Sequence, residues 1–306
     1  MLPALRGPVL GKIAGDLQQA LERRAVRGTP GGAAATTLGK GEGWSAADVI
    51  CTSGPADRPF EEQHVGVSIA VVVAGSFQYR SPNGRGMMTP GSLLVGNAGD
   101  CFECGHEHAA GDRCIAFRYG SDFFERIASD VGATRSARRF RTSRLPPIRP
   151  LSRLAARAAA GAAFAVDVSW EEMAVETAAT AVQLSAGTQP TSVVSSAAIL
   201  ARVTESVRRI EEEPGAPWTL ARLAADARQS PFHYLRTFHQ LAGVTPHQFI
   251  LRARLRQAAV MLLAGKAKVI EIALAAGFGD VSNFNGAFKA EFGVSPRAYR
   301  ARQGRP

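Results

Sequence analysis

Residues 101–114 combine three cysteines with two histidines, side chains that bind transition metals or react with oxidants. In an extended segment every second residue shares a face, so Cys104, His106 and His108 would point the same way. Thiolate sulfur and imidazole nitrogen are preferred ligands of zinc in proteins. We therefore predict a site for zinc or another transition metal, with His64 on a preceding strand as an additional candidate. The predicted ligands are Cys104, His106, His108 and Cys114.

The same residues fit two other interpretations. All four cysteines precede residue 115, and a reducing compartment keeps such thiols free, so we expect no disulfide framework. In one interpretation a thiol senses oxidants or electrophiles. In the other, small cysteines fill a protein core while the histidines lie in a solvated turn, and the protein senses an organic effector or none. The pattern alone assigns no cofactor.

A second informative feature is a segment that occurs twice near the end of the chain. Residues 238–246 read FHQLAGVTP and residues 288–296 read FKAEFGVSP. An alanine-rich stretch precedes each copy, which predicts a helix, a tight turn and a second helix in both units. Gly277 stands at the turn of the second copy, where a left-handed backbone is expected, whereas the first copy has Arg228. The predicted N-caps of the two second helices are Ser230 and Ser282.

A single long helix is predicted to join the two units. Residues 246–264 carry apolar side chains at helical spacing, which would make this helix a rigid spacer with Arg252, Arg254 and Arg256 facing outward. From Thr191 onward there are 16 Lys and Arg against 8 Asp and Glu, so +8 of the net charge of +10 lies in this portion. Such a basic surface is typical of proteins that bind the phosphates of nucleic acids.

Residues 198–303 resemble the DNA-binding domain of the AraC/XylS family of transcriptional regulators. The resemblance rests on the helix that contains Arg254 and Ala258 and on residues 220–227 (LARLAADA), 230–238, 271–278 (EIALAAGF), 282–289 (SNFNGAFK) and 293–300 (GVSPRAYR). It implies that each second helix enters a major groove of double-stranded DNA, about one DNA turn apart on the same face. It also implies a bacterial-type regulator that contacts RNA polymerase. Gly286 stands where the family usually has arginine, so the first unit is expected to supply most of the discrimination between bases.

Helix geometry selects the side chains that would contact DNA. In each second helix they lie on the face opposite the apolar residues. Arg236 is the leading candidate because a guanidinium can form a bidentate contact with guanine. Phe232 and Leu235 would meet thymine methyl groups or pack on a neighbouring helix, and Asn283 and Asn285 would read adenine or cap the helix. The complete predicted set is Ser230, Phe232, His233, Leu235, Arg236, His239, Val281, Ser282, Asn283 and Asn285.

The first two thirds of the chain has a different character. Short β-branched and aromatic runs between turn residues predict a β-sandwich or barrel over residues 36–145. Its segment TPGSLL, residues 89–94, resembles the small cupin-like sensor domains that often precede this DNA-binding domain. Helical spacing over residues 146–194 predicts a region that dimerises the protein or packs on the sandwich, with a hinge at residues 188–192. We expect residues 1–35 to form a poorly ordered extension.

The predicted fold class is α+β. A cupin-like β-barrel or sandwich sensor precedes an all-α domain over residues 195–303, with helix-turn-helix units at about 218–242 and 268–292. The chain shows no signal peptide and no membrane-spanning run, so we expect a cytoplasmic protein. The predicted function is sequence-specific transcription regulation in response to a small molecule, a metal or a redox signal, without enzyme activity and with a homodimer as one arrangement. The alternative is a cupin-type metal-dependent enzyme fused to a DNA-binding domain.

Overall fold

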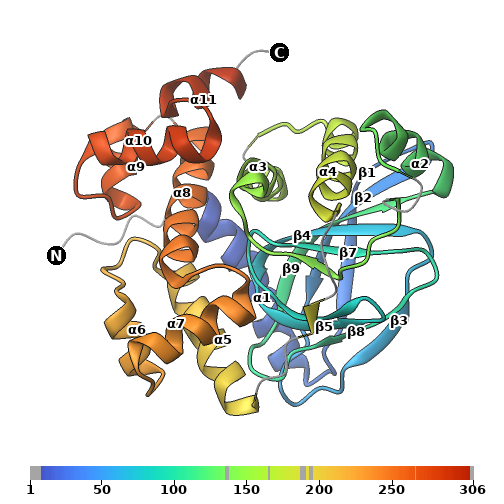
Figure 1. Cartoon of the computed structure of the whole chain (residues 1–306), viewed down its shortest axis with the longest axis horizontal. Helices are drawn as coiled ribbons and strands as arrows, with labels where there is room; N and C mark the ends of the chain where they lie inside the picture. Colours follow the sequence, from blue (N-terminus) through green and yellow to red (C-terminus); the bar gives the residue numbers. More distant parts are fainter. Residues whose placement is uncertain are drawn as a thin grey trace.

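The computed structural model describes residues 8–134, 138–164, 166–186, 191–192, 196–265 and 267–303. Its β-strands lie in the N-terminal part and the helices after residue 196 form a second group, which confirms the predicted α+β fold (Figure 1). Helix α8, Pro246–Ala264, runs through the middle of that group, with the sheets to one side of it. Within the described residues, no helix is both long and apolar enough to cross a membrane.

Two sheets form the N-terminal domain. In the described part of the chain, one sheet has six strands in the order β1-β2-β9-β4-β7-β10, and the other has five in the order β11-β6-β5-β8-β3. The first sheet comprises β1 (Ala33–Gly41), β2 (Trp44–Cys51), β9 (Asp112–Tyr119), β4 (Val67–Gly75), β7 (Leu93–Gly96) and β10 (Arg144–Leu145). The second comprises β11 (Thr191–Ser192), β6 (Gly84–Met88), β5 (Phe77–Ser81), β8 (Cys101–Gly105) and β3 (Phe60–Gln63).

Strand β4 shows why its sheet is buried on both faces. Ile69 and Val71 join the core formed with helices α3 (Ser152–Ala162) and α4 (Trp170–Ser185). Val72 points the other way and joins a core with Phe77 of the second sheet. Successive side chains in a strand alternate between faces, so one apolar run fills both cores. Helices α3 and α4 therefore pack on the sandwich, and their role in dimerisation stays a prediction.

In the part of the N-terminal extension that the structure describes, residues 8–27 form a helix, where the sequence predicts a poorly ordered segment. Helix α1, Pro8–Arg27, packs against the six-stranded sheet, and its Ile13 is only 1% exposed. The buried Arg113 of β9 donates two hydrogen bonds to Asp48 and one to Asp16 of α1. Burial lowers the Arg113 pKa, but these two carboxylates raise it further, so the guanidinium stays charged. A buried ion-pair network thus fastens α1 to the sheet.

The C-terminal domain contains two small cores, one at each end of α8. In the first, Tyr234 and Phe238 pack with Phe249. In the second, Phe284 and Phe288 pack with residues of α8, as the predicted inward faces require. The helices of this domain are α5 (Ala197–Glu212), α6 (Leu220–Asp226), α7 (Pro231–Ala242), α8, α9 (Val269–Ala275), α10 (Val281–Phe292) and α11 (Pro296–Gln303). The pairs α6–α7 and α9–α10 are the two helix-turn-helix units.

The two second helices are capped by different residues. Ser230 caps α7, and its side chain accepts a hydrogen bond from the His233 backbone, as predicted. The prediction of Ser282 as the cap of α10 is wrong, because Asp280 accepts from the Asn283 backbone at 2.8 Å. A carboxylate at this position also interacts favourably with the positive end of the helix dipole. Ser282 is therefore left exposed on the helix surface.

The turns of the two units carry the same backbone conformation on different residues. Gly277 has φ 80° and Arg228 has φ 54°. A left-handed backbone costs a residue with a side chain about 1–2 kcal/mol, whereas glycine adopts it freely. The first turn is therefore strained.

Replacing Arg228 with glycine should stabilise the protein. The relief of strain exceeds the extra unfolded-state entropy of glycine, so we expect a gain of about 0.5–1 kcal/mol. The matched control is Gly277→Ala, which should destabilise because the added Cβ would lie 2.6 Å from the Gly215 carbonyl oxygen. Urea denaturation of the full chain measures both changes. An unchanged or lower stability of R228G would show that Arg228 is not strained.

The predicted helix over residues 246–264 is confirmed as α8, but its three arginines do not face outward as the sequence predicts. Arg252 lies 3.2 Å from Glu291 of α10, and Arg256 lies 2.5 Å from Glu211 of α5. Arg254 donates to two backbone carbonyls between α5 and α6. The N-terminal domain also covers α8 through α3 and α1. The prediction failed because it treated α8 as a surface helix of an isolated domain.

One stretch of the N-terminal domain contacts both helix-turn-helix units. We call residues 144–152 the bridging segment. Its Arg144 is buried and donates from Nη1 to the carbonyl oxygens of Met87 and Leu241, at 2.7 and 2.5 Å. Leu241 belongs to the last turn of α7, whose carbonyls lack partners within the helix. At the other end, Ser152 donates to Glu291 of α10.

Candidate nucleic-acid interface and sensor-domain sites

We call α7 and α10, the second helix of each unit, the first and second reading helices. Helix α7 exposes the face that the sequence predicts for DNA contact. Phe232 is 69% exposed, unusual for a large aromatic residue. The Arg236 guanidinium lies over its ring, 5.9 Å from the centroid. Such a cation–π contact restricts the guanidinium before DNA arrives. The predicted residues Ser230, His233 and His239 are exposed as well, and Leu235 is half-buried.

The second reading helix, α10, has a less specific exposed face. Asn285 is exposed, and Asn283 donates its side-chain amide to Asp280 at 2.5 Å, so it is already used in the cap. Val281 is half-buried. A Cβ added at Gly286 would meet nothing within 4 Å, so the surface there is open. This face offers small polar groups, and Lys289, one turn after Asn285, adds a cation.

Further positive charge lies in a groove beside α10. This groove is lined by Lys268, Lys289, Arg297 and Arg300, from four different positions around α9, α10 and α11. Lysine and arginine in such a groove complement the negative charge of a phosphate backbone, which does not depend on the base sequence. The predicted set omitted these residues because it considered only base contacts. Their charge was the signal that could have found them.

The spacing of the two units follows from α8. Its 19 residues span about 28 Å at about 1.5 Å per residue. Successive major grooves on one face of a duplex repeat every 34–36 Å or so. Figure 1 shows α6–α7 near one end of α8 and α9–α10 near the other. The length of α8 is thus of the same order as the repeat of the major groove.

The predicted metal site is not assembled as expected. Strand β8 ends at Gly105, so His106 and His108 do not follow it at alternating positions. Nε2 of His108 lies 3.9 Å from Glu107, and His108 does not join His106 in a ligand group. Cys114 donates its thiol to Asp112 at 3.2 Å. Burial raises the pKa of both Cys104 and Cys114 well above the usual value for a thiol.

A different group comes together at this end of the sandwich. In the described residues, one potential ligand atom from each of Cys51, His106 and Asp112 lies within 4.8 Å of the others, and all three side chains are buried. Nε2 of His106 is 2.7 Å from Oδ1 of Asp112. Burial lowers the His106 pKa, but the contacts with Asp112 and Cys51 outweigh it and raise the pKa to about 9. Sequence analysis missed Cys51 and Asp112 because they meet only through strand pairing.

His64 is a core residue rather than a ligand in this group. Its Nε2 lies 2.8 Å from the Tyr79 hydroxyl, and its ring stacks on Phe102 at 4.2 Å. Burial lowers its pKa to about 4, so the ring is neutral. The pair fills space between the sheets.

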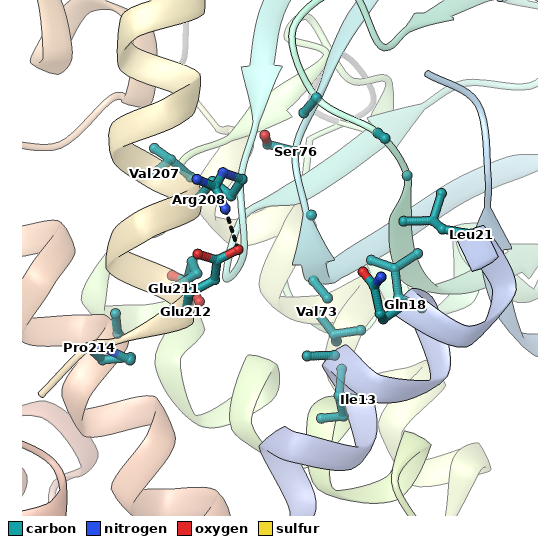
Figure 2. A pocket seen from close by; sticks show the side chains of 18 of the residues that line it. Ile13, Gln18, Leu21, Val73, Ser76, Val207, Arg208, Glu211, Glu212 and Pro214 are labelled. Atoms are coloured by element: carbon teal, nitrogen blue, oxygen red, sulfur yellow. Dashed lines mark hydrogen bonds and ion pairs between the residues drawn. The ribbon is translucent and has the colours of Figure 1, made fainter. Parts of the chain in front are cut away.

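A cavity of about 380 Å³ lies between the two domains. Figure 2 shows Ile13, Gln18 and Leu21 of α1 on one side and Val207, Arg208, Glu211 and Glu212 of α5 on the other. The end of β4, residues 109–111, Pro214, and Ala253 and Arg256 of α8 also line the cavity. Most lining side chains are apolar, with the charged groups at the α5 side. A molecule in this cavity would touch both domains.

Two capped helix pairs joined by one helix define a double helix-turn-helix domain, and comparison with known proteins agrees. Residues 223–302 match the family model for a helix-turn-helix domain. The HTH-type transcriptional regulator MtrA of Neisseria gonorrhoeae is 31% identical over 103 residues, 34% of this chain and 34% of that protein. The RCS-specific HTH-type transcriptional activator RclR of Escherichia coli (strain K12) is 34% identical over 101 residues, 33% of this chain and 36% of that protein. Residues 223–302 thus form a helix-turn-helix domain of the type found in AraC/XylS transcriptional regulators.

The similarity to these two relatives covers about a third of this chain. The chain spans about a third of the length of these curated relatives. Among solved structures, the DNA-binding domain of AdpA in complex with a target DNA is 32% identical and covers 33% of this chain and 91% of that chain, with a TM-score of 0.32. An AraC-type regulator from Chromobacterium violaceum is 27% identical and covers 36% of this chain and 99% of that chain, with a TM-score of 0.33.

Proposed function

We propose that the chain is a sequence-specific DNA-binding transcriptional regulator of the AraC type. The main support is the pair of exposed reading faces, on α7 and α10, at the two ends of one helix. In this proposal they enter successive major grooves on one side of double-stranded DNA. Because relatives that share the domain are named as transcriptional regulators, we propose no enzyme activity. RNA polymerase and a second copy of the chain are the further partners we propose.

The two reading helices have unequal roles in this proposal. Arg236, held over Phe232, reads a base, with guanine as the best match for a bidentate guanidinium. On α10, Asn285 and Ser282 make weaker polar contacts. The groove that contains Lys289 holds the phosphate backbone and sets the position of the domain.

The N-terminal domain is proposed to sense a signal and to transmit it by direct contact. Support comes from the bridging segment, which contacts α7 through Arg144 and α10 through Ser152. A small molecule in the cavity between α1 and α5 would act on the same interface. A signal can shift the arrangement of the reading helices only by as much as it binds one arrangement more tightly than the other.

Replacing Arg236 with alanine tests the role of α7. We expect about 1–3 kcal/mol less discrimination at one base pair, since that is the contribution of one bidentate contact. The measurement is selection of preferred sites from random DNA by the full chain, followed by fluorescence anisotropy on the selected site.

The matched control is Lys289→Ala on α10. It should weaken binding about equally for all sequences and reduce the salt slope of log K by about 1, as for a lost phosphate contact. Arg236 does not read a base if R236A keeps the parental site preference. If neither variant changes binding, neither helix is at the interface.

A further inference from the structure

The end of the sandwich where β2, β4 and β9 meet gathers potential metal ligands from separate strands. Cys51, the last residue of β2, pairs in register with Asp112, the first residue of β9. Gly75, the last residue of β4, pairs with Asp112 on the other side. His106 follows directly after β8 of the second sheet. Both sheets therefore contribute to one group of side chains.

The protein alone does not satisfy these side chains. Nδ1 of His106 is buried and has no hydrogen-bond partner among the described residues. The neighbouring Arg113 is directed to Asp48 and Asp16, so its charge serves another network. Among the described hydrogen bonds, Asp112 has only His106 and the Cys114 thiol as side-chain partners. A carboxylate and an incompletely bonded imidazole thus face a thiol in a buried space.

We infer that Cys51, His106 and Asp112 bind a divalent zinc ion through three protein ligands, which leaves a fourth position open. Sulfur, nitrogen and oxygen donors of this kind suit zinc, which prefers four ligands. On binding, the Cys51 thiol and the protonated His106 imidazole each give one proton to solvent. The thiolate and the Asp112 carboxylate then carry two negative charges, which match the charge of the ion. Uncompensated burial of either anion would be costly.

The site would join the two sheets and fix the loop between its ligands. Residues 107–111 connect His106 to Asp112, and residues 109–111 form a wall of the cavity that faces α5. A Cβ added at Gly111 would lie 3.0 Å from the Cys51 carbonyl oxygen and 3.0 Å from Leu17 of α1, so there is no room for a side chain there. Metal binding therefore orders the part of the N-terminal domain that lies next to the DNA-binding domain.

Titration of the metal-free full chain with Co²⁺, followed by displacement with Zn²⁺, tests the site. We expect one equivalent of Co²⁺ to produce a thiolate-to-cobalt charge-transfer band, which Zn²⁺ abolishes. Cys51→Ser and Asp112→Asn should each weaken binding at least about 10-fold, the smallest loss typical of even an outer-shell partner. The matched controls are Cys101→Ser, at the exposed first residue of β8, and His108→Gln. Both should bind Co²⁺ with the affinity of the parent protein.

X-ray absorption at the zinc edge of the unaltered protein provides a test that needs no variant. We expect at least one sulfur ligand together with nitrogen or oxygen ligands. The absence of a cobalt–thiolate band at one equivalent, or parental affinity in C51S, would overturn the inference. If H108Q lost binding while C51S retained it, the metal would instead use the ligands of residues 104–108.

Discussion

Replacing Phe288 with alanine is expected to destabilise the protein by about 3–5 kcal/mol, the cost typical of deleting a buried phenylalanine side chain. Phe288 has no exposed surface, and its ring contacts Phe284, Phe292 and Tyr299, with centroids 5.6, 4.4 and 5.3 Å away. These aromatic residues belong to the second small core of the C-terminal domain, together with residues of α8 and α9. The loss should therefore unfold the second helix-turn-helix unit first. Urea denaturation combined with hydrogen exchange of the α10 amides measures it.

The matched control is Phe232→Ala in the first unit. The same atoms are removed, but from a side chain that is 69% exposed, so stability should change by no more than about 0.5 kcal/mol. DNA binding distinguishes the variants further, because F288A should lose the contacts of α10 while F232A keeps them. A similar stability for both variants would contradict the burial of Phe288 in the second core of the C-terminal domain.

Replacing Arg144 with methionine is expected to cost about 3–6 kcal/mol, because each of two hydrogen bonds to a charged group contributes about 1.5–3 kcal/mol. Burial lowers the Arg144 pKa to about 10, so the guanidinium is still charged at neutral pH. Methionine keeps much of the volume but donates nothing to the carbonyls of Met87 and Leu241. Hydrogen exchange should accelerate in β6 and at the end of α7, because the substitution removes the contacts that join the two domains there.

Arg139→Met provides the control for removing an arginine. Arg139 pairs with Asp100, but its side chain is 66% exposed, so its ion pair contributes little. We expect a change below about 1 kcal/mol and no acceleration of exchange in α7. If R144M behaved like R139M, the bridging segment would not hold the domains together.

The parts of the structure that sequence predicted well depend on local pattern. The repeated segment predicts two helix-turn-helix units. Its inward residues lie three or four positions apart, which indicates helices, and its glycines mark where the helices end. The strands follow from β-branched runs between turns. The exposed face of α7 was predictable for the same reason, because the apolar side of a helix determines its polar side.

What sequence did not predict depends on contacts between distant segments. Arg256 is buried because α5 and the N-terminal domain cover it, and nothing near it in sequence signals this. Cys51 and Asp112 are 61 positions apart and meet only through strand register. The helix over residues 8–27 was predictable in part. Ile13, Leu17 and Leu21 recur every four residues, a helical pattern that the glycine-rich stretch after it obscured.

The bridging segment has a consequence for the DNA sites that the protein would accept. Because residues 144–152 contact the ends of both α7 and α10, the N-terminal domain constrains the distance and twist between the two reading helices. We therefore expect that a change in that domain alters tolerance for an added or deleted base pair between the two half-sites. The recognition of either half-site by itself would remain the same.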